Sequence, residues 1–321
     1  MAALAAGLGF STFSSAQSVT TTPVGAVSTT FPANSLKAFS LQLEESSVSI
    51  ATLSSVSTNT ITSSTSNWTS GAFAAVDAPY GVRITSGTYA GVMFVITGNT
   101  TNQLTVQTDG VDLTTVLSGT ETVSVIPLDT LGTLFGTSSV PFKSGTTAAS
   151  ADVIFIWSGT GWLAYFHNGT NWRRSGSGLN QNNTVIPLDV GLFIQRKDIT
   201  DLSLTITGNV RSASARRFIK PNASTFLANP FPVDMTFANS GFRTSNAWQT
   251  GASAAAADSV YLWNGTGWQV YFHNGTSWRR AGSGLNQDAT AIPAGSPMFV
   301  LRRSNPAYKD SVVTHTTPYT L

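Results

Sequence analysis

The residues best suited to chemistry in this chain form two sets that lie 106 positions apart. Each set combines aromatic, imidazole and guanidinium side chains, a combination that can stack on sugar rings and hydrogen-bond to their hydroxyl groups. The eight candidate binding residues are Tyr165, His167, Trp172, Arg173, Tyr271, His273, Trp278 and Arg279. A surface of this composition predicts an extracellular carbohydrate-binding protein with glycan partners, which is one of two functional hypotheses.

Packing offers a simpler explanation for the tryptophans. Indoles on neighbouring strands stabilise a sheet as cross-strand pairs, and we expect Trp162 and Trp268 to lie in the core. Trp172 and Trp278 are each followed by two arginines, and we favour them as strand-end anchors whose arginine stems cover apolar surface. Period-two alternation places the Tyr–His pair of each set on the strand face opposite to Trp162 or Trp268. The Tyr–His face is therefore the better candidate for binding.

Groups that could perform catalysis are few: the chain has no cysteine, and its three histidines lack the spacing of metal ligands beside a carboxylate. Asp152 and Asp258 are equivalent strand-start residues, where aspartate commonly accepts hydrogen bonds from the local backbone. A glycosidase holds two carboxylates at a defined separation, and nothing in the sequence indicates that these two meet. Glu44 and Glu45 follow a strand-like run and are expected to face solvent. We therefore predict no enzyme activity, no metal and no cofactor.

Both sets belong to a block of 46 residues that occurs twice, starting at Asp152 and at Asp258, with 26 positions identical. In each copy, short runs rich in Val, Ile and aromatic residues alternate with Gly and Asn, which is typical of antiparallel β-structure. The Asn-Gly dipeptides at 168–169 and 274–275 are strong hairpin signals because both residues tolerate positive φ. Each copy is therefore predicted to be a β-meander followed by one further strand. A lone meander cannot bury its own face, which favours packing of the two copies together.

The remaining sequence indicates further β-structure and a division into parts. Short β-prone runs at 81–85, 90–97, 103–107 and 121–126 predict a small antiparallel module inserted into the first copy. We thus predict an all-β fold of two duplicated antiparallel β-meander units, sandwich-like or barrel-like, with one inserted module. The predicted parts are 1–16 (signal peptide), 17–49 (N-terminal strands of the first repeat unit), 50–126 (inserted module), 127–208 (first Trp-rich repeat), 209–304 (second Trp-rich repeat) and 305–321 (C-terminal extended tail).

Charge is scarce, since only 10% of the residues are charged and the formal net charge is +2. No stripe of Lys and Arg suits a phosphate backbone, which argues against nucleic acid as a partner. No apolar run reaches the roughly eighteen residues of a membrane span. Residues 2–10 form a short apolar run followed by small residues and a plausible cleavage site after Ala16, as in a secretory signal, although no basic residue precedes it. We expect a secreted protein, outside the cell or at the bacterial cell surface.

One motif carries a resemblance to a known family. Trp-x-Gly-Thr-Gly-Trp, followed by Tyr-Phe-His-Asn-Gly-Thr-x-Trp-Arg-Arg, spans 157–174 and recurs at 263–280. Together with the segment 79–100, it resembles a family of exported bacterial hypothetical proteins with duplicated Trp-rich β repeats. The resemblance implies no activity and no site residues. The spacing of Gly-Trp, Asn-Gly and Trp is also similar to choline-binding cell-wall repeats, but those are many short contiguous units, whereas here two copies lie 106 residues apart.

Segments that favour extended structure lie near both ends of the chain, at 18–31 and 310–320. Each can be a terminal strand of its own sheet, which is the commoner case, or can complete the sheet of a neighbouring molecule. The second case is our leading hypothesis: a structural protein that assembles with copies of itself into a filament, surface layer or matrix, helped by its weak net charge. The candidate assembly residues are Val19, Val24, Val27, Phe31, Val312, Val313 and Tyr319.

Overall fold

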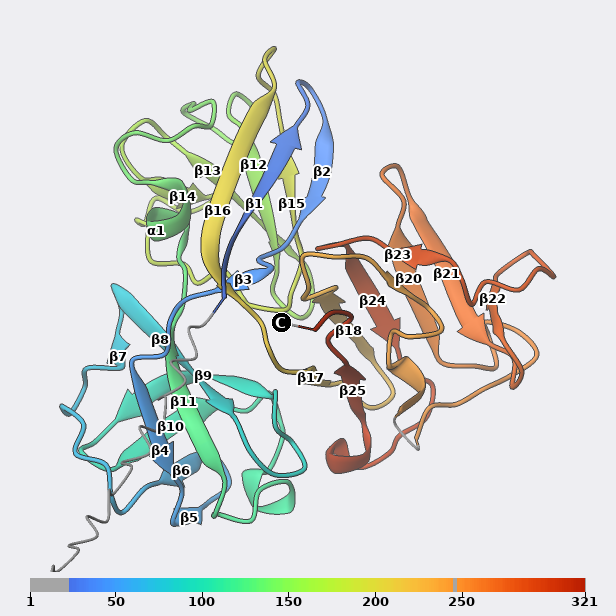
Figure 1. Cartoon of the computed structure of the whole chain (residues 1–321). Coiled ribbons are helices and arrows are strands. Elements are labelled where there is room, and N and C mark those ends of the chain that lie inside the picture. The colour runs from blue at the N-terminus through green and yellow to red at the C-terminus, as the bar shows by residue number, and fades with distance from the viewer. Residues whose placement is uncertain (1–22, 245–246, 321) are drawn as a thin grey trace, which may run out of the picture.

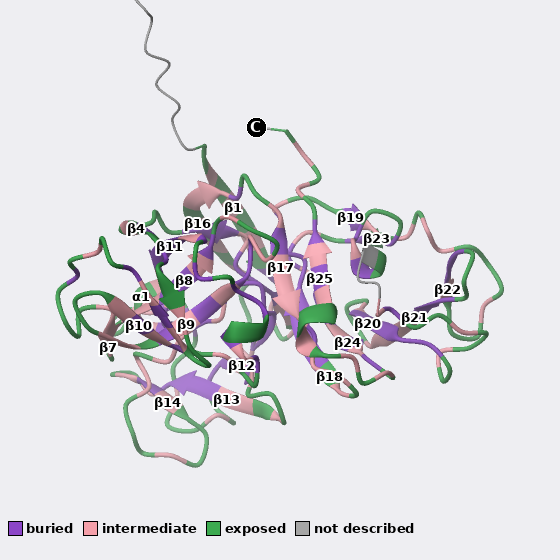
Figure 2. Ribbon diagram, turned by 90° about the horizontal axis from the view of Figure 1, so that it is seen from below, coloured by how far each residue is buried: buried purple, intermediate pink, exposed green. Residues whose placement is uncertain are grey.

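The computed structural model describes residues 23–244 and 247–320. Within these ranges the chain folds into antiparallel sheets, and its helical segments are helix α1 (Leu131–Phe135) and short 3-10 turns (Figure 1). The prediction of an all-β fold is therefore confirmed. Buried residues follow the strands, and exposed residues lie mainly in the connecting loops (Figure 2). The predicted signal peptide, residues 1–16, and the assembly candidate Val19 lie outside the described residues.

The first Trp-rich copy forms a five-stranded sheet. Its strands, in order across the sheet, are β14 (Trp172–Arg174), β13 (Trp162–His167), β12 (Val153–Trp157), β15 (Leu192–Gln195) and β2 (Leu36–Phe39). Asn168 closes the turn between β13 and β14, because its Oδ1 accepts the N–H groups of Thr170 and Asn171 at 3.0 and 2.9 Å. Gly169 has a φ of +101° in this turn, a conformation that glycine adopts without steric cost. The Asn-Gly dipeptide thus forms a hairpin turn, as the sequence predicts.

The second copy repeats this sheet strand for strand. Its strands, in the same order, are β22 (Trp278–Arg280), β21 (Trp268–His273), β20 (Ser259–Trp263), β24 (Pro297–Leu301) and β18 (Ser224–Ala228). The register is also repeated, since Trp157 pairs with Trp162 and Trp263 pairs with Trp268. The duplicated sequence therefore folds into two sheets of the same topology.

The duplication extends to the strands that flank each sheet. These flanking strands are β1 (Val24–Phe31) and β16 (Leu202–Val210) in the first half, and β17 (Ala215–Phe218) and β25 (Val312–His315) in the second. β1 pairs with β16, and β17 pairs with β25. Asn34 and Asn222 form the same turn before β2 and β18, with φ of 50° and 47°. Asparagine tolerates this left-handed conformation better than most residues. The repeated structural unit is thus larger than the 46-residue block.

One sheet has no counterpart in the second copy, and we call it the inserted sheet. Its strands are β4 (Ser49–Thr52), β5 (Ser55–Val56), β6 (Thr60–Thr62), β7 (Ala74–Ala75), β8 (Ala78–Ile84), β9 (Met93–Asn99), β10 (Gln103–Gln107) and β11 (Thr122–Pro127). They run in the order β4, β11, β8, β9, β10, β6, β5, with β7 paired to β8. The inserted sheet has its own apolar core, which includes Ile61, Val82 and Leu104. In the second copy only residues 229–234 separate β18 from the next strand, β19 (Met235–Thr236), which pairs with β23 (Ala291–Ile292).

The two five-stranded sheets pack against each other through aromatic side chains. The ring centroids of Trp157 and Phe299 are 5.1 Å apart, and those of the duplicated pair, Trp263 and Phe193, are 5.2 Å apart. The contact between the sheets therefore has approximate twofold symmetry. Aromatic pairs of this kind contribute about 0.5–1.5 kcal/mol each beyond the area that they bury. The two copies consequently form one body.

The twofold symmetry is broken at one pair of equivalent positions, which hold Ala38 in the first copy and Phe226 in the second. Ala38 lies opposite Phe193, and Phe226 lies opposite Phe299. The Phe226 ring lies 5.1 Å from Trp162 and 4.6 Å from Phe299. Trp162 packs in this contact and still has 37% of its surface exposed, and Trp268 is half-buried. These two tryptophans thus lie at the edge of the contact between the copies rather than deep in a core.

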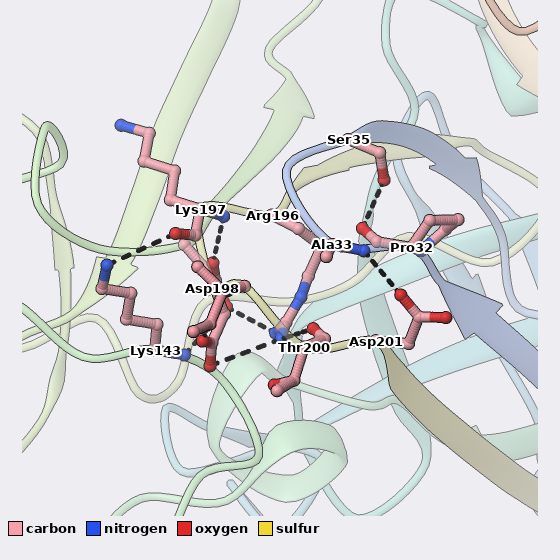
Figure 3. A network of polar contacts seen from close by, with 11 residues as sticks. Pro32, Ala33, Ser35, Lys143, Arg196, Lys197, Asp198, Thr200 and Asp201 are labelled. Carbon is pink, nitrogen blue, oxygen red and sulfur yellow. Dashed lines mark hydrogen bonds and ion pairs between the residues drawn. The ribbon is translucent and has the colours of Figure 1, made fainter.

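A buried ion pair begins each copy. Asp152 Oδ2 lies 2.5 Å from Arg196 Nη1, and Asp258 Oδ2 lies 3.1 Å from Arg302 Nε. Each aspartate also accepts two backbone N–H groups, and these donors are Lys143 and Lys197 in the first copy and Gln249 and Arg303 in the second. Figure 3 shows the surroundings of Arg196 in the first of these networks. The strand-start aspartates therefore hold the ends of strands and loops together.

A second ionic cluster joins the inserted sheet to the segment that links the two copies. Arg211, in that segment, lies 2.5 Å from Asp189 and 2.7 Å from Glu44. Glu44, on β3 (Leu43–Glu44), also pairs with Arg83 of β8. The expectation that Glu44 faces solvent is therefore wrong, although Glu45 is exposed. The Glu44 carboxylate can be buried because two guanidinium groups compensate its charge.

The segments near the two ends form strands or contacts within the chain. The described assembly candidates are Val24, Val27 and Phe31 in β1, Val312 and Val313 in β25, and Tyr319. β1 pairs with β16 along its whole length, and β25 pairs with β17 (Figure 1). Tyr319 Oη donates a hydrogen bond to Arg211 O at 2.9 Å. β1 and β25 are thus strands of their own sheets, the commoner of the two cases, and neither is free to be donated to a neighbour.

His315, on β25, is buried in its neutral form. Its Nδ1 lies 2.6 Å from Ser240 O and donates to it, and its Nε2 has no hydrogen-bond partner within the described residues. A proton on Nε2 would therefore be a buried donor without an acceptor. Burial lowers the pKa of His315 to about 4, from 6.5.

The first prediction concerns the buried ion pair of the second copy. We expect Asp258→Asn to lower the free energy of unfolding by about 3–5 kcal/mol, because Arg302 would stay buried without its counter-charge. Urea unfolding followed by tryptophan fluorescence measures this. The exposed Asp77 gives the control, since Asp77→Asn should change stability by less than about 0.5 kcal/mol. Unchanged unfolding of the Asp258 variant would show that the pair is dispensable.

The second prediction follows from the neutral His315 ring. Between pH 6.5 and pH 4 the unfolded chain binds a proton at this residue and the folded chain does not, so stability falls as the pH is lowered through this window. The stability that depends on the neutral His315 ring is fully present above pH 6.5. By pH 4 the free energy of unfolding has fallen by about 3 kcal/mol. His315→Phe should lose less stability than the wild type between pH 7 and pH 4.5 in urea unfolding. An equal loss in both proteins would contradict the assignment.

Candidate functional site

The tyrosine, histidine and tryptophan residues that the sequence predicts to bind a glycan are buried. Tyr165 and His167 have 4% and 1% of their surface exposed, and Trp172 has none. Their buried counterparts in the second copy are Tyr271, His273 and Trp278. A glycan cannot reach these side chains, so the prediction of a binding surface here is wrong. Alternation along the strand cannot reveal this, because each five-stranded sheet is covered on one face by its flanking strands and loops and on the other by the second sheet.

His167 and Trp172 hold a loop against the sheet. His167 Nε2 lies 2.8 Å from Thr137 O, and Trp172 Nε1 donates a hydrogen bond to Gly136 O at 2.8 Å. Both acceptors lie directly after α1. These contacts fix the segment that follows the helix, which is the anchoring role that packing suggests for this tryptophan.

Arg173 and Arg279 also serve the fold. Each guanidinium donates a hydrogen bond to the carbonyl group five residues further along the chain, Gly178 in the first copy and Gly284 in the second. This contact closes an exposed loop with the same sequence, Gly-Ser-Gly-Leu-Asn-Gln, in both copies. The two arginines are thus bound to the protein's own backbone and do not form the predicted glycan surface with the buried tryptophans beside them.

The strand-start acids do not form the pair that a glycosidase needs. Asp152 and Asp258 are each buried against an arginine of their own copy. In the part of the chain that the structure describes, no group of three His, Asp or Glu side chains is placed to hold a metal ion. No helix within residues 23–244 or 247–320 is long and apolar enough to cross a membrane.

A cavity of about 380 Å³ lies where the inserted sheet meets both copies, and we call it the junction pocket. This volume is within the range of small-molecule sites. The inserted sheet contributes β9 and the residues after β10, and the first copy contributes the turn after β12 and part of 185–190. The second half contributes β17, β18 and the 3-10 turn η3 (Tyr308–Asp310). All three parts of the molecule thus build one site.

Three basic side chains line the junction pocket: Arg216 and Arg217 on β17, and Lys220 just after it. Arg217 Nη1 donates to Leu188 O at 3.3 Å, the single hydrogen bond of this guanidinium within the described residues. None of the ion pairs found within the described residues includes Arg217 or Lys220. Desolvation lowers the pKa of Arg217, while nearby carboxylates act in the opposite direction. The pocket therefore contains positive charge that no direct carboxylate contact neutralises.

Arg216 and Gly91 fix the wall between the inserted sheet and β17. Arg216 Nε donates to Thr314 Oγ1 at 3.2 Å, and its Nη1 donates to Thr88 O. Gly91 has a φ of +101°, and a Cβ at this position would lie 2.2 Å from Ser214 O. A residue with a side chain would collide with the backbone just before β17, so glycine is required for the close approach. Arg216 is thus a structural residue of the wall, and Arg217 is the freer cation.

The turn η3 forms another part of the wall. Tyr308 Oη donates to Asp109 O at 3.3 Å, and Tyr89 Oη donates to Lys309 O at 2.9 Å. These two hydrogen bonds link η3 to the inserted sheet. Asp109 is the acid among the lining residues, and its Oδ1 accepts a hydrogen bond from Gln107 Nε2 at 2.9 Å. The lining carboxylate is therefore engaged by a neutral amide.

None of the junction-pocket residues is among those predicted from the sequence. They come from segments such as 92–95, 107–111 and 216–218, which no local spacing brings together. One signal was present in Ala215-Arg216-Arg217-Phe218, where two arginines interrupt a β-prone run in a chain with few charges. Charge in such a place usually needs a partner, and the partner cannot be identified before the fold is known.

Comparisons with known proteins assign no family to this chain. A scan against protein-family models, a search of curated proteins and a search of solved structures all found no match. The resemblance to exported Trp-rich repeat proteins stays a prediction. The functional interpretation therefore depends on the geometry and charge of the junction pocket.

Proposed function

We propose that this chain is an exported binding protein that holds a small anionic ligand in the junction pocket and catalyses no reaction on it. The observation that carries the proposal is the Arg217 guanidinium, which is half-buried and bonds only to a carbonyl group within the described residues. Removing a charge from water is unfavourable unless an opposite charge compensates it. A carboxylate or phosphate in the pocket would supply that charge, and its hydrogen bonds to a guanidinium are stronger than those between neutral groups.

Lys220 supports the same proposal. Its Nζ approaches the turn at Gly159, where a Cβ would lie 3.8 Å away. This ammonium group forms no hydrogen bond or ion pair within the described residues. Arg217 and Lys220 together outweigh the one lining acid, Asp109. Because the whole chain has a net charge of only +2, this excess is a local property. A cleft lined by one sign of charge attracts ligands of the opposite sign.

Export is part of the proposal. The apolar run at 2–10 and the small residues before position 17 support a secretory signal, and the scarcity of charged residues suits a protein outside the cell. In that location the pocket would meet organic acids, phosphate and acidic sugars from the surroundings.

The third prediction tests the pocket. We expect a small anion to bind the wild type, and Arg217→Met to weaken this binding by about tenfold or more, because a charged hydrogen-bonding group is lost. Isothermal titration calorimetry with galacturonate, citrate and inorganic phosphate at low ionic strength measures the affinities. Arg174 is exposed and lies outside the pocket, so Arg174→Met is the matched control and should bind like the wild type. Absence of binding to any of the three anions, or equal affinity in the Arg217 variant, would contradict the proposal.

Self-assembly into a filament, surface layer or matrix is a second candidate function, and the free edge of β1 favours it. Val210 N donates to Pro23 O at 2.8 Å, so alternate residues of β1 bond to β16 and the residues between them point away. The N–H groups of Val24, Ala26 and Ser28 consequently point away from β16. β1 itself contains no charged residue and no proline, which commonly protect an edge, although Lys37 Nζ donates to Thr30 O at 2.7 Å near the end of the strand. A strand of a second copy can therefore extend this sheet.

The fourth prediction concerns this edge. Ala26→Pro removes an outward N–H group and is tolerated on an edge strand, so the pairing of β1 with β16 is kept. If assembly uses β1, the substitution should lower the association constant by about tenfold, because ladder hydrogen bonds are lost from the contact. Sedimentation velocity over a range of concentrations measures this, and Ala26→Val, which keeps the N–H group, should assemble like the wild type. A wild type that stays monomeric throughout would exclude this candidate.

A further inference from the structure

We infer that the ligand of the junction pocket is an acidic sugar of one or two rings that carries a carboxylate, an inference that rests on the proposed binding function. The basic residues explain why the ligand is an anion, and the rest of the lining indicates what else it carries. Aromatic rings and neutral hydroxyl groups share the wall with Arg217 and Lys220. A uronic acid has the three matching features, which are a carboxylate, an apolar C–H face and several hydroxyl groups.

The aromatic part of the lining is held rigidly. The Phe218 ring is supported by Phe94 and Tyr89, with centroid distances of 6.3 and 5.6 Å. The Trp157 ring is supported by Phe299 at 5.1 Å. Phe218 and Trp157 are both half-buried, so part of each ring remains accessible beside the cations. A fixed ring of this kind offers the C–H face of a sugar a flat apolar surface that needs no reorganisation.

The polar part of the lining is mostly uncharged. Thr108 and Ser224 contribute hydroxyl groups to the pocket, and within the described residues these side chains make no hydrogen bond. A hydroxyl group both donates and accepts, so it can pair with a sugar hydroxyl in either direction. Gln107 adds an amide at the same wall. Neutral groups with both capacities suit a ligand that itself carries many hydroxyl groups.

Inorganic phosphate and simple organic acids share the anionic group and are the main competitors for Arg217. They lack an extended C–H face, so they would make no stacking contact with Phe218 or Trp157. Neutral sugars have that face but would leave Arg217 without a direct carboxylate contact. The cavity of about 380 Å³ accommodates a monosaccharide or a disaccharide. Only a ligand with both properties uses the whole lining.

The fifth prediction compares these ligands on the full chain. In isothermal titration calorimetry we expect galacturonate or glucuronate to bind about tenfold more tightly than galactose, acetate or inorganic phosphate, because only the uronates use both parts of the lining. Phe218→Leu keeps an apolar side chain but removes the flat ring. It should weaken uronate binding by about fivefold or more and leave phosphate binding unchanged. Circular dichroism and urea unfolding show whether this variant is folded, and the wild-type comparison alone decides the case if it is not.

The outcomes separate this inference from the proposed function. Acetate or phosphate binding as tightly as the uronates, with dependence on Arg217, would overturn the acidic-sugar assignment and leave the anion-binding proposal standing. Failure of every anion to bind would overturn both. Uronate binding that depends on Arg217 and on Phe218, with Arg174→Met unchanged, would support both.

Discussion

The buried pair of an aspartate and an arginine at the start of each copy is the interaction on which the rest of the structure depends. Asp152 and Arg196 join the start of β12 to the end of β15, and Asp258 and Arg302 do the same for β20 and β24. Each carboxylate also accepts backbone N–H groups from the flanking loops, so strands, loops and charge are tied at one point. A buried pair of this kind is strongly destabilising to break. It holds each sheet in the form in which the tryptophan faces of the two copies meet.

Duplication produces two similar halves, and the inserted sheet makes the molecule asymmetric. The strands β1 and β17 are equivalent, so Arg216 and Arg217 take the positions that Ser28 and Thr29 have in the first half. The inserted sheet packs against β17 through Gly91 and leaves the edge of β1 open. One strand of the duplicated pair is therefore a charged wall of the junction pocket, and the other is an uncharged edge strand. The two functional candidates belong to these two diverged copies of a single strand.

The sequence predicts the local parts of this structure and fails on the long-range parts. The dipeptide at 168–169 forms its turn because Asn and Gly carry that preference in themselves. Alternation identifies the strands, but Trp162 and Tyr165 lie on opposite faces that are both covered, so period two gives no sign of a face open to a ligand. Glu44 and Arg217 are misjudged or overlooked for the same reason. The residues that surround them come from distant parts of the sequence. The charge of a residue alone does not predict which groups it will contact.

The position of the inserted sheet has a consequence for how the chain reaches its native state. β2 and β15 are neighbours in one sheet although more than 150 residues separate them. Closing such a long loop costs entropy, and a topology rich in distant pairings folds slowly. In the inserted sheet the first strand, β4, pairs with the last, β11, with Ser49 opposite Val125, so its two ends lie side by side. If the inserted sheet folds early from its nearer contacts, its residues no longer count toward the loop that must close between β2 and β15. The N-terminal strands can then pair with strands that are synthesised much later.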